Sequence, residues 1–247
     1  MAHYQYTEKG EGHTLIFLHG IMGGLSNFQS AVRHFELKGY RAIVPELPVL
    51  NMPISEANVV GLTHYLKNFI AYKKLDSFTL IGNSVGGHIS LMYAKLFPEK
   101  VKALVLTGSS GLYERSMGRG YPKRGNYNYI QKRTQEVFFD PTMATKEIVD
   151  DVFAMVNDNS KLLRTLSLAK SAIRHNVAGD LPYLDIPTCI IWGKNDTVTP
   201  AAVALEFNEL MPFSELFWIA ECGHAPMMEH PEKFNNILGT WLETQNL

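Results

Sequence analysis

The chain has 247 residues, of which 46% are apolar and 19% are charged, and its formal net charge is −1. A chain of this length and composition can bury a full hydrophobic core, and one α/β domain is the default expectation. The near-zero net charge excludes a broad field that would attract nucleic acid or an anionic membrane, so we expect a small, weakly charged or neutral ligand.

No stretch of the sequence approaches the length needed to span a bilayer, and the N-terminus has no basic segment followed by an apolar run. We therefore expect a soluble, cytoplasmic protein, a monomer or a homodimer, with neither a membrane nor a nucleic acid as partner. Cys189 and Cys222 provide no disulfide framework, and their spacing matches no metal site. Both cysteines are expected to be reduced and buried.

Short apolar runs alternate along the chain with segments whose apolar residues recur every three or four positions. The short runs predict strands and the longer segments predict amphipathic helices. The predicted strands, in chain order, are 14–18, 41–44, 78–81, 101–106, 188–192 and 215–219. The predicted helices that alternate with them are 28–37, 57–72, 85–97, 201–210 and 234–241.

Strands that alternate with helices pair in parallel through right-handed crossovers, and near-continuous apolar strands are covered on both faces. The predicted fold class is therefore α/β, with a mostly parallel, doubly wound sheet. The alternation stops at 112–180, where a Gly- and Arg-rich stretch precedes two or three helical segments at 127–139, 146–156 and 161–173. We interpret 112–180 as a helical insertion that shapes a binding site, and 1–111 with 181–247 as the core domain.

One pentapeptide, Gly82-Asn83-Ser84-Val85-Gly86, follows a predicted strand and opens a predicted helix. A serine in such a turn has a strained backbone and an exposed hydroxyl, and small flanking glycines let strand and helix approach closely. The pattern alone would be weak, but its strand-turn-helix context favours Ser84 as a nucleophile.

A serine hydroxyl needs a base within hydrogen-bond reach and a carboxylate that orients the base. Asp196 follows the strand at 188–192, and His224 follows the strand at 215–219, so both should lie at the carboxyl edge of the sheet with Ser84. Asp196 has a rival interpretation as a turn or helix-capping residue, and His224 as a structural loop histidine. The order Ser, Asp, His at successive strand ends favours a catalytic triad.

Acyl transfer also needs donors for the oxyanion, and backbone N–H groups usually supply them. We predict the N–H groups of Ile21, in a glycine-rich loop, and Val85, at the start of a helix where the dipole favours negative charge. His19 is expected to brace that loop rather than take a proton. The histidines lack paired metal-ligand spacing, so we expect no metal and no other cofactor.

With these residues in place, the chain resembles the α/β-hydrolase superfamily, in particular its small esterase and carbon-carbon hydrolase branch. The matching segments include Leu18-His19-Gly20, Gly82 to Gly87, Trp192-Gly193 and Gly223-His224-Ala225-Pro226. The resemblance implies that 112–180 is a cap over the active site. Carbon-carbon hydrolases of this branch commonly have tryptophan directly after the catalytic histidine, where this chain has Ala225.

We therefore expect a serine hydrolase that cleaves a small-molecule carboxylic ester through an acyl-enzyme. A carbon-carbon hydrolase of ring-cleavage products and a non-catalytic receptor on the same fold are the alternatives. Arg119 or Arg124 could bind a substrate carboxylate, or could belong to a solvated loop. The candidate substrate-binding residues are Met22, Phe28, Tyr113, Arg119, Arg124, Phe138 and Met227.

Overall fold

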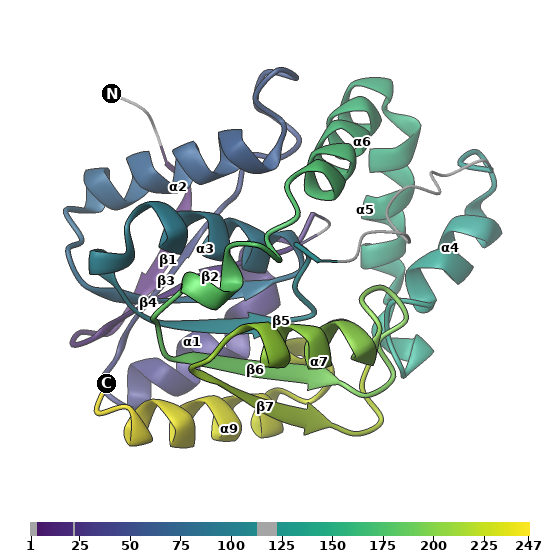
Figure 1. Ribbon diagram of the computed structural model, residues 1–247. Coiled ribbons are helices and arrows are strands. Elements are labelled where there is room, and N and C mark those ends of the chain that lie inside the picture. The colour runs from purple at the N-terminus through teal and green to yellow at the C-terminus, as the bar shows by residue number, and fades with distance from the viewer. Residues whose placement is uncertain (1–3, 22, 113–122) are drawn as a thin grey trace.

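A seven-stranded sheet forms the centre of the molecule (Figure 1). The computed structural model describes residues 4–21, 23–112 and 123–247. Within these ranges the strands lie in the order β1-β3-β2-β4-β5-β6-β7, and all neighbours are parallel except β1 and β3. The strands are β1 (Tyr6–Lys9), β2 (Thr14–Leu18), β3 (Arg41–Pro45), β4 (Phe78–Asn83), β5 (Val101–Thr107), β6 (Thr188–Gly193) and β7 (Ser214–Ile219).

The six strands predicted from apolar runs are confirmed, each with ends within two residues of the prediction. Strand β1 was missed. Its residues are only partly buried and include Glu8 and Lys9, and it pairs antiparallel with β3 at the sheet edge. Edge strands commonly carry charged residues, so β1 lacks the apolar run that identified the others.

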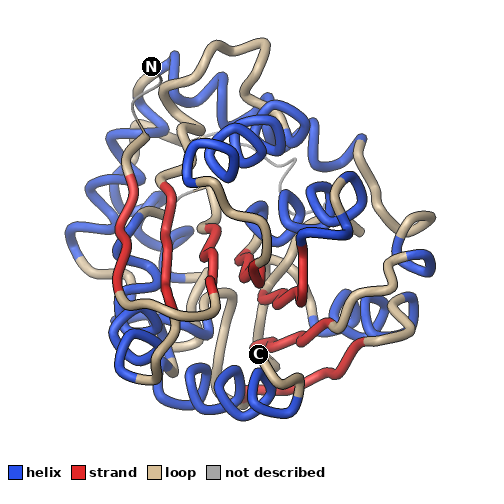
Figure 2. The backbone as a smooth tube through the Cα atoms, turned by 90° about the vertical axis from the view of Figure 1, so that its left-hand side faces the viewer, coloured by secondary structure: helices blue, strands red, loops and turns tan. Residues whose placement is uncertain are grey.

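Helices cover both faces of the sheet, and Figure 2 shows helices on either side of the strands, which twist progressively across the sheet. Helices α2, α3 and α7 pack with one core cluster, and α1, α8 and α9 with the other. Their bounds are α1 (Gln29–Leu37), α2 (Val59–Lys73), α3 (Val85–Leu96), α7 (Ala201–Leu210), α8 (Pro226–Glu229) and α9 (Pro231–Thr244). Short 3-10 helices are η1 (Leu25–Phe28), η2 (Pro98–Lys100), η4 (Pro141–Met143) and η5 (Leu181–Tyr183).

Alternation along the central strands builds the two cores. In β2, Leu15 and Phe17 face the α1 and α9 side, whereas Ile16 and Leu18 face the α2 and α3 side, and all four are fully buried. Successive side chains of a strand point to opposite faces, so a continuous apolar run serves both layers. The sheet is thereby a rigid platform whose carboxyl edge presents the loops.

Helices α4 (Tyr127–Gln135), α5 (Lys146–Asn157) and α6 (Asn159–Arg174) lie beyond the carboxyl ends of the strands (Figure 1). Each begins after a residue whose side chain accepts a backbone N–H of the first turn, namely Asn126, Thr145 and Asp158. Helices α4 and α5 share a small hydrophobic cluster built around Ile130 and Val156, whereas Leu168 and Ala172 of α6 pack with the core of the sheet. The helical content predicted for 112–180 is confirmed in its described part, while the division into core and cap domains stays a prediction.

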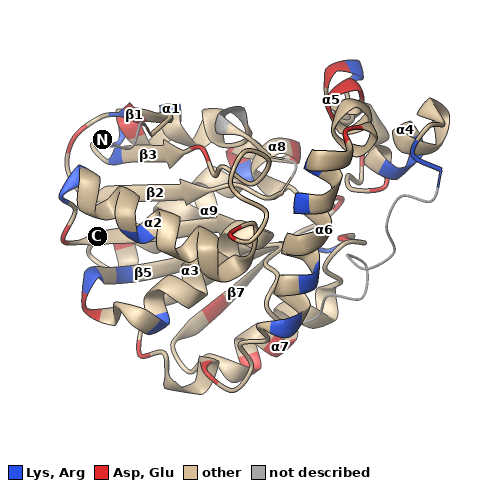
Figure 3. Ribbon diagram, turned by 90° about the horizontal axis from the view of Figure 1, so that it is seen from above, with Lys and Arg blue, Asp and Glu red and all other residues tan. Residues whose placement is uncertain are grey.

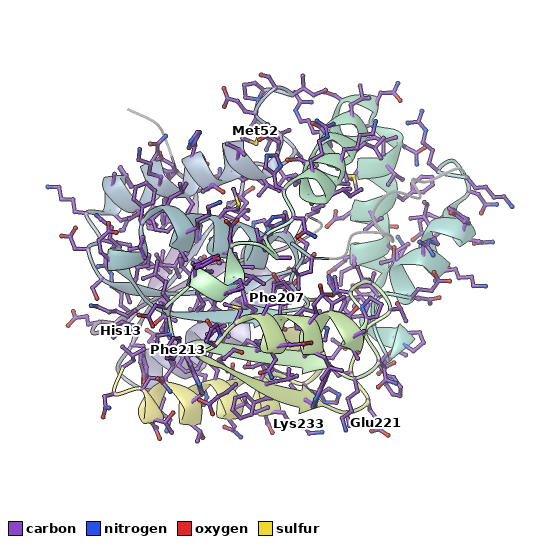
Figure 4. The ribbon with its side chains drawn as sticks, in the orientation of Figure 1. His13, Met52, Phe207, Phe213, Glu221 and Lys233 are labelled. Carbon is purple, nitrogen blue, oxygen red and sulfur yellow. The ribbon has the colours of Figure 1, made fainter. Side chains whose placement is uncertain are left out.

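The two roots of the insertion, at residues 111–112 and 176–177, are hydrogen-bonded to each other. Val177 N–H donates to Gly111 O at 2.8 Å, and Asn176 Nδ2 donates to Leu112 O at 2.9 Å. Farther along, Arg164 Nε donates to Met52 O at 2.6 Å, beside α6 in Figure 4. Lys, Arg, Asp and Glu residues occur along the ribbon of the core and of the described part of the insertion alike (Figure 3). Within the described ranges, no helix combines the length and the apolar character that a membrane crossing requires.

Candidate active site

Ser84 occupies the sharp turn between β4 and α3. Its backbone has φ 55° and ψ −122°, a conformation that non-glycine residues rarely adopt. Ser84 N–H donates to Thr107 O at 3.1 Å, and Ser84 O accepts from Gly87 N at 3.0 Å and Ser110 N at 3.1 Å. These hydrogen bonds hold Ser84 in a strained backbone conformation, which is typical of a functional site.

Two glycines of the turn are required by close backbone contacts. A Cβ at Gly82 would lie 2.4 Å from Gly87 Cα, and a Cβ at Gly86 would lie 2.1 Å from Leu18 O. Both distances are below any real carbon contact, so the turn closes only with hydrogen at these positions. The close approach of strand and helix that the sequence predicted is present.

Asp196 follows β6 and contacts His224, which follows β7. Asp196 Oδ2 accepts from His224 Nδ1 at 2.8 Å. Asp196 Oδ1 accepts from Val198 N at 2.8 Å and from Thr199 N at 2.9 Å, and Thr199 Oγ1 donates to Oδ2 at 2.9 Å. The carboxylate therefore contacts the histidine and also organises its own turn, as the rival interpretation expected, while the catalytic role of Asp196 stays a prediction.

The protonation of the imidazole follows from these contacts. A carboxylate only accepts hydrogen bonds, so Nδ1 of His224 carries the proton of this bond and Nε2 is the ring nitrogen that Asp196 does not engage. Asp196 is 6% exposed, His224 7% and Ser84 7%. Electrostatic interactions are stronger in such a buried environment than in water.

Asn83 and Gly108 support the site, and sequence analysis assigned a role to neither. Asn83 Nδ2 donates to Thr107 O and to His224 O, both at 3.0 Å, which links the serine turn to the histidine loop. Gly108 has φ 51°, and a Cβ there would lie 2.8 Å from His224 Nδ1. These roles depend on contacts between separate strand ends, and no local sequence signal marks them.

The loop after β2 lies against the nucleophile. A Cβ on Gly20 would be 3.2 Å from Ser84 Cβ. His19 braces this loop as predicted, because its Nδ1 contacts Gly20 O at 2.8 Å and its Nε2 accepts from Leu47 N at 3.0 Å. Burial lowers the pKa of His19, which keeps the ring neutral for this role.

The two predicted oxyanion donors lie in suitable elements. Ile21 is partly buried in the loop after β2, and Val85 is the first residue of α3. The first N–H groups of a helix have no partner within the helix, so Val85 N–H is available to an anion. Their roles as donors stay predictions, as does the proton transfer between Ser84 and His224.

The candidate substrate-binding residues fall into three groups. Phe28 is fully buried with its ring centroid 5.1 Å from that of Phe17, and Met227 is buried in the same core cluster, so their observed contacts are structural. Arg124 Nη1 donates to Val156 O at 3.3 Å, and Phe138 is partly buried next to the histidine loop. Met22, Tyr113 and Arg119 lie outside the described residues.

The two cysteines are buried and free. Burial is the largest cause that raises the pKa of both thiols, with the Glu229 carboxylate adding to it at Cys222. Neither thiol therefore offers a reactive thiolate to the site.

The fold and this arrangement of side chains define a class of protein. The sequence pattern of the alpha/beta hydrolase fold matches residues 13–231, and the chain belongs to this family. Together with the hydrolase names of its relatives, this identifies the protein as a hydrolase enzyme.

Individual relatives cover nearly the whole chain. A 2-hydroxy-6-oxo-6-phenylhexa-2,4-dienoate hydrolase of Burkholderia cepacia is 27% identical over 93% of this chain and 87% of its own. A 2-hydroxy-6-oxononadienedioate/2-hydroxy-6-oxononatrienedioate hydrolase of Comamonas testosteroni is 26% identical, with the same shares covered, 93% and 87%. Among solved structures, the α/β hydrolase enzyme MGS-MChE2, from the metagenome of lagoon sediments at Mar Chica, Morocco, is 46% identical over 100% of this chain and 98% of its own, with a TM-score of 0.83.

Proposed function

We propose that this protein is a serine hydrolase that cleaves a small-molecule carboxylic ester through an acyl-enzyme. The observation that carries the proposal is the 2.8 Å contact of His224 Nδ1 with Asp196, at the same sheet edge as Ser84 in its strained turn. This set of groups matches the needs of nucleophilic acyl transfer, in which a base activates a hydroxyl and a carboxylate orients the base.

The proposed reaction has two halves. Ser84 Oγ attacks the ester carbonyl while His224 Nε2 takes its proton, and the N–H groups of Ile21 and Val85 stabilise the oxyanion. His224 then gives the proton to the departing alcohol. In the second half, His224 activates a water that attacks the acyl-enzyme, and the acid and free Ser84 are released.

In the described part of the insertion, the contacts of the arginines favour a neutral rather than an anionic substrate. A carboxylate substrate is best bound by a bidentate arginine. Three described arginines of the insertion already have partners. Arg124 and Arg164 donate to backbone carbonyls, and Arg133 forms an ion pair with Glu136. Arg174 is exposed to solvent. Arg119, the other candidate for this role, lies outside the described residues.

The second candidate is hydrolysis of a carbon-carbon bond in a ring-cleavage product. Relatives with dienoate hydrolase names, 26 to 27% identical over 93% of the chain, favour it. The same serine and histidine would act, on an acidic ketone in place of an ester. Ala225, directly after the catalytic histidine, is the residue that separates this chain from the pattern common in that group.

One panel of assays tests both candidates. Nitrophenyl esters of graded acyl length and a dienoate ring-fission product are offered to the wild type and to Ser84→Ala. We expect turnover of at least one ester, labelling of the wild type by a fluorophosphonate probe, and loss of both in the variant. Turnover of the dienoate alone would replace the ester proposal with the second candidate, and a wild type inert to substrates and probe would overturn both.

A further inference from the structure

The segment after α4, residues 136–140, touches both loops that carry the acid and the base. We call it the anchor segment. Thr197 Oγ1, next to Asp196, donates to Glu136 O at 2.7 Å. The backbone N–H of His224 donates to Val137 O at 2.9 Å. The insertion is therefore fastened to the catalytic loops themselves, in addition to its two roots.

Glu229, the last residue of α8, supplies the strongest part of this attachment. Its Oε1 accepts from Gly223 N at 2.8 Å, and its Oε2 accepts from Phe139 N at 2.7 Å and Asp140 N at 3.4 Å. One carboxylate thus joins the residue before the catalytic histidine to the anchor segment. Hydrogen bonds to an ionised acceptor are about twice as strong as neutral ones.

The ion pairs among the described residues do not include Glu229. Its charge is directed at backbone N–H groups, which have fixed positions, instead of at a mobile cationic side chain. A carboxylate placed in this way holds two backbone segments at a defined separation.

Gly223 provides an independent sign that this separation matters. A Cβ at Gly223 would lie 2.6 Å from Val137 O and 2.8 Å from Phe139 N. The histidine loop and the anchor segment are therefore in direct backbone contact, which a larger residue would push apart. Any shift of the anchor segment is transmitted to the residue adjoining His224.

From this geometry we infer that Glu229 is a positioning residue, which fixes the place of His224 by locking the anchor segment onto the histidine loop. The inference rests on the proposed function, because it assigns His224 as the base. A base displaced by about 1 Å can cost about a hundredfold in rate. Glu229 touches no reacting atom and acts only through the loop.

The test compares Glu229→Gln with Glu232→Gln, an equal loss of charge at an exposed position in the first turn of α9. A glutamine keeps one acceptor oxygen, so it can bind only one of the two segments and turns an N–H donor toward the other. We expect Glu229→Gln to lower kcat per probe-titrated active site by about tenfold or more, with KM for a short ester changed less than about threefold. Glu232→Gln should match the wild type.

Hydrogen exchange of the Phe139 and Gly223 amides gives a readout that does not depend on turnover. At least one of the two should exchange faster in Glu229→Gln and neither in Glu232→Gln. Unchanged kcat per active site, or equal losses in both variants, would overturn the inference. If Glu229→Gln does not fold, Glu229→Asp keeps the charge but withdraws it by one methylene, and is judged by the same two criteria. If the wild type hydrolyses no substrate, the proposed function fails, while the exchange comparison still decides whether Glu229 locks the two segments.

Discussion

The serine turn and the histidine loop are held in place by different means. Ser84 is fixed within the core domain, by a strained φ of 55°, by hydrogen bonds to Thr107 and Ser110 and by glycines that admit the backbone of β2 and α3. His224 is held by Asp196, by the carbonyl of Val137 in the insertion and, through Gly223, by the carboxylate of Glu229, which also binds the insertion. Ser84 is therefore positioned by the core domain, whereas the position of His224 depends on the insertion as well.

The largest effect is expected from Asp196→Asn, which alters the histidine without moving its loop. The oxygen of the introduced amide would keep the bonds from Val198 N and Thr199 N, and the amide NH2 would then face His224 Nδ1. The ring would adopt the tautomer with a proton on Nε2, which cannot accept the proton of Ser84. The same change in a serine protease triad costs about 10⁴-fold in kcat, and we expect a loss of that order here.

Steady-state ester hydrolysis measures this loss, with Asp185→Asn as the control because Asp185 is exposed and precedes β6. The control should keep wild-type kcat. An Asp196→Asn enzyme with more than about a tenth of wild-type kcat would show that Asp196 is only a turn residue.

A second comparison tests how far the serine turn depends on local packing. Gly86→Ala places a Cβ 2.1 Å from Leu18 O, which the rigid sheet cannot relieve. Gly24→Ala, in the loop after β2, meets nothing within 4 Å. Urea unfolding should show a loss of about 3 kcal/mol or more for Gly86→Ala and less than about 0.5 kcal/mol for Gly24→Ala. Similar stabilities would mean that the turn can open without cost.

The same contrast explains which parts of the site the sequence predicts. Ser84, Asp196 and His224 follow apolar strands, and parallel strands bring their carboxyl ends to one edge, so chain order alone places them together. Asn83, Gly108 and Glu229 act across segments distant in sequence, and nothing near them indicates their partners. The helices of the insertion were likewise predictable from periodicity, but the role of residues 136–140 appears only in three dimensions.

The sequence likewise predicted the buried elements of the fold better than those at its edge. Continuous apolar runs identified the buried strands, whereas β1, with Glu8 and Lys9 at the sheet edge, gave no such signal. Amphipathic periodicity located the helices because their buried faces recur every three to four residues. Ends of elements differ by a few residues, since caps such as Asn58 at α2 act through side-chain contacts that periodicity does not register.

The smallest effect concerns His88, which links the serine helix α3 to the far root of the insertion. Its Nε2 donates to His175 O at 2.8 Å, and its Nδ1 faces Ser110 Oγ at 3.4 Å. Burial, the largest cause, lowers the pKa of His88 to about 4 from its usual 6.5. The hydrogen bond to His175 O opposes this lowering, and the nearby His175 side chain adds to it. The ring is therefore neutral in the folded protein at neutral pH.

The sign of the pH dependence follows from these values. Between pH 6.5 and about 4 the unfolded chain binds a proton at His88 that the folded protein does not, so stability falls as the pH is lowered through this window. The loss of folding stability caused by His88 reaches about 3 kcal/mol near pH 4. His88→Gln should be less stable than the wild type at pH 7, but the difference should shrink steadily toward pH 4. Urea unfolding at a series of pH values measures it, with His64→Gln, on the exposed face of α2, as the control whose curve stays parallel to the wild type. If the His88→Gln curve also stays parallel to the wild-type curve, His88 is not held neutral in the folded protein. Packing alone would then join the insertion to α3.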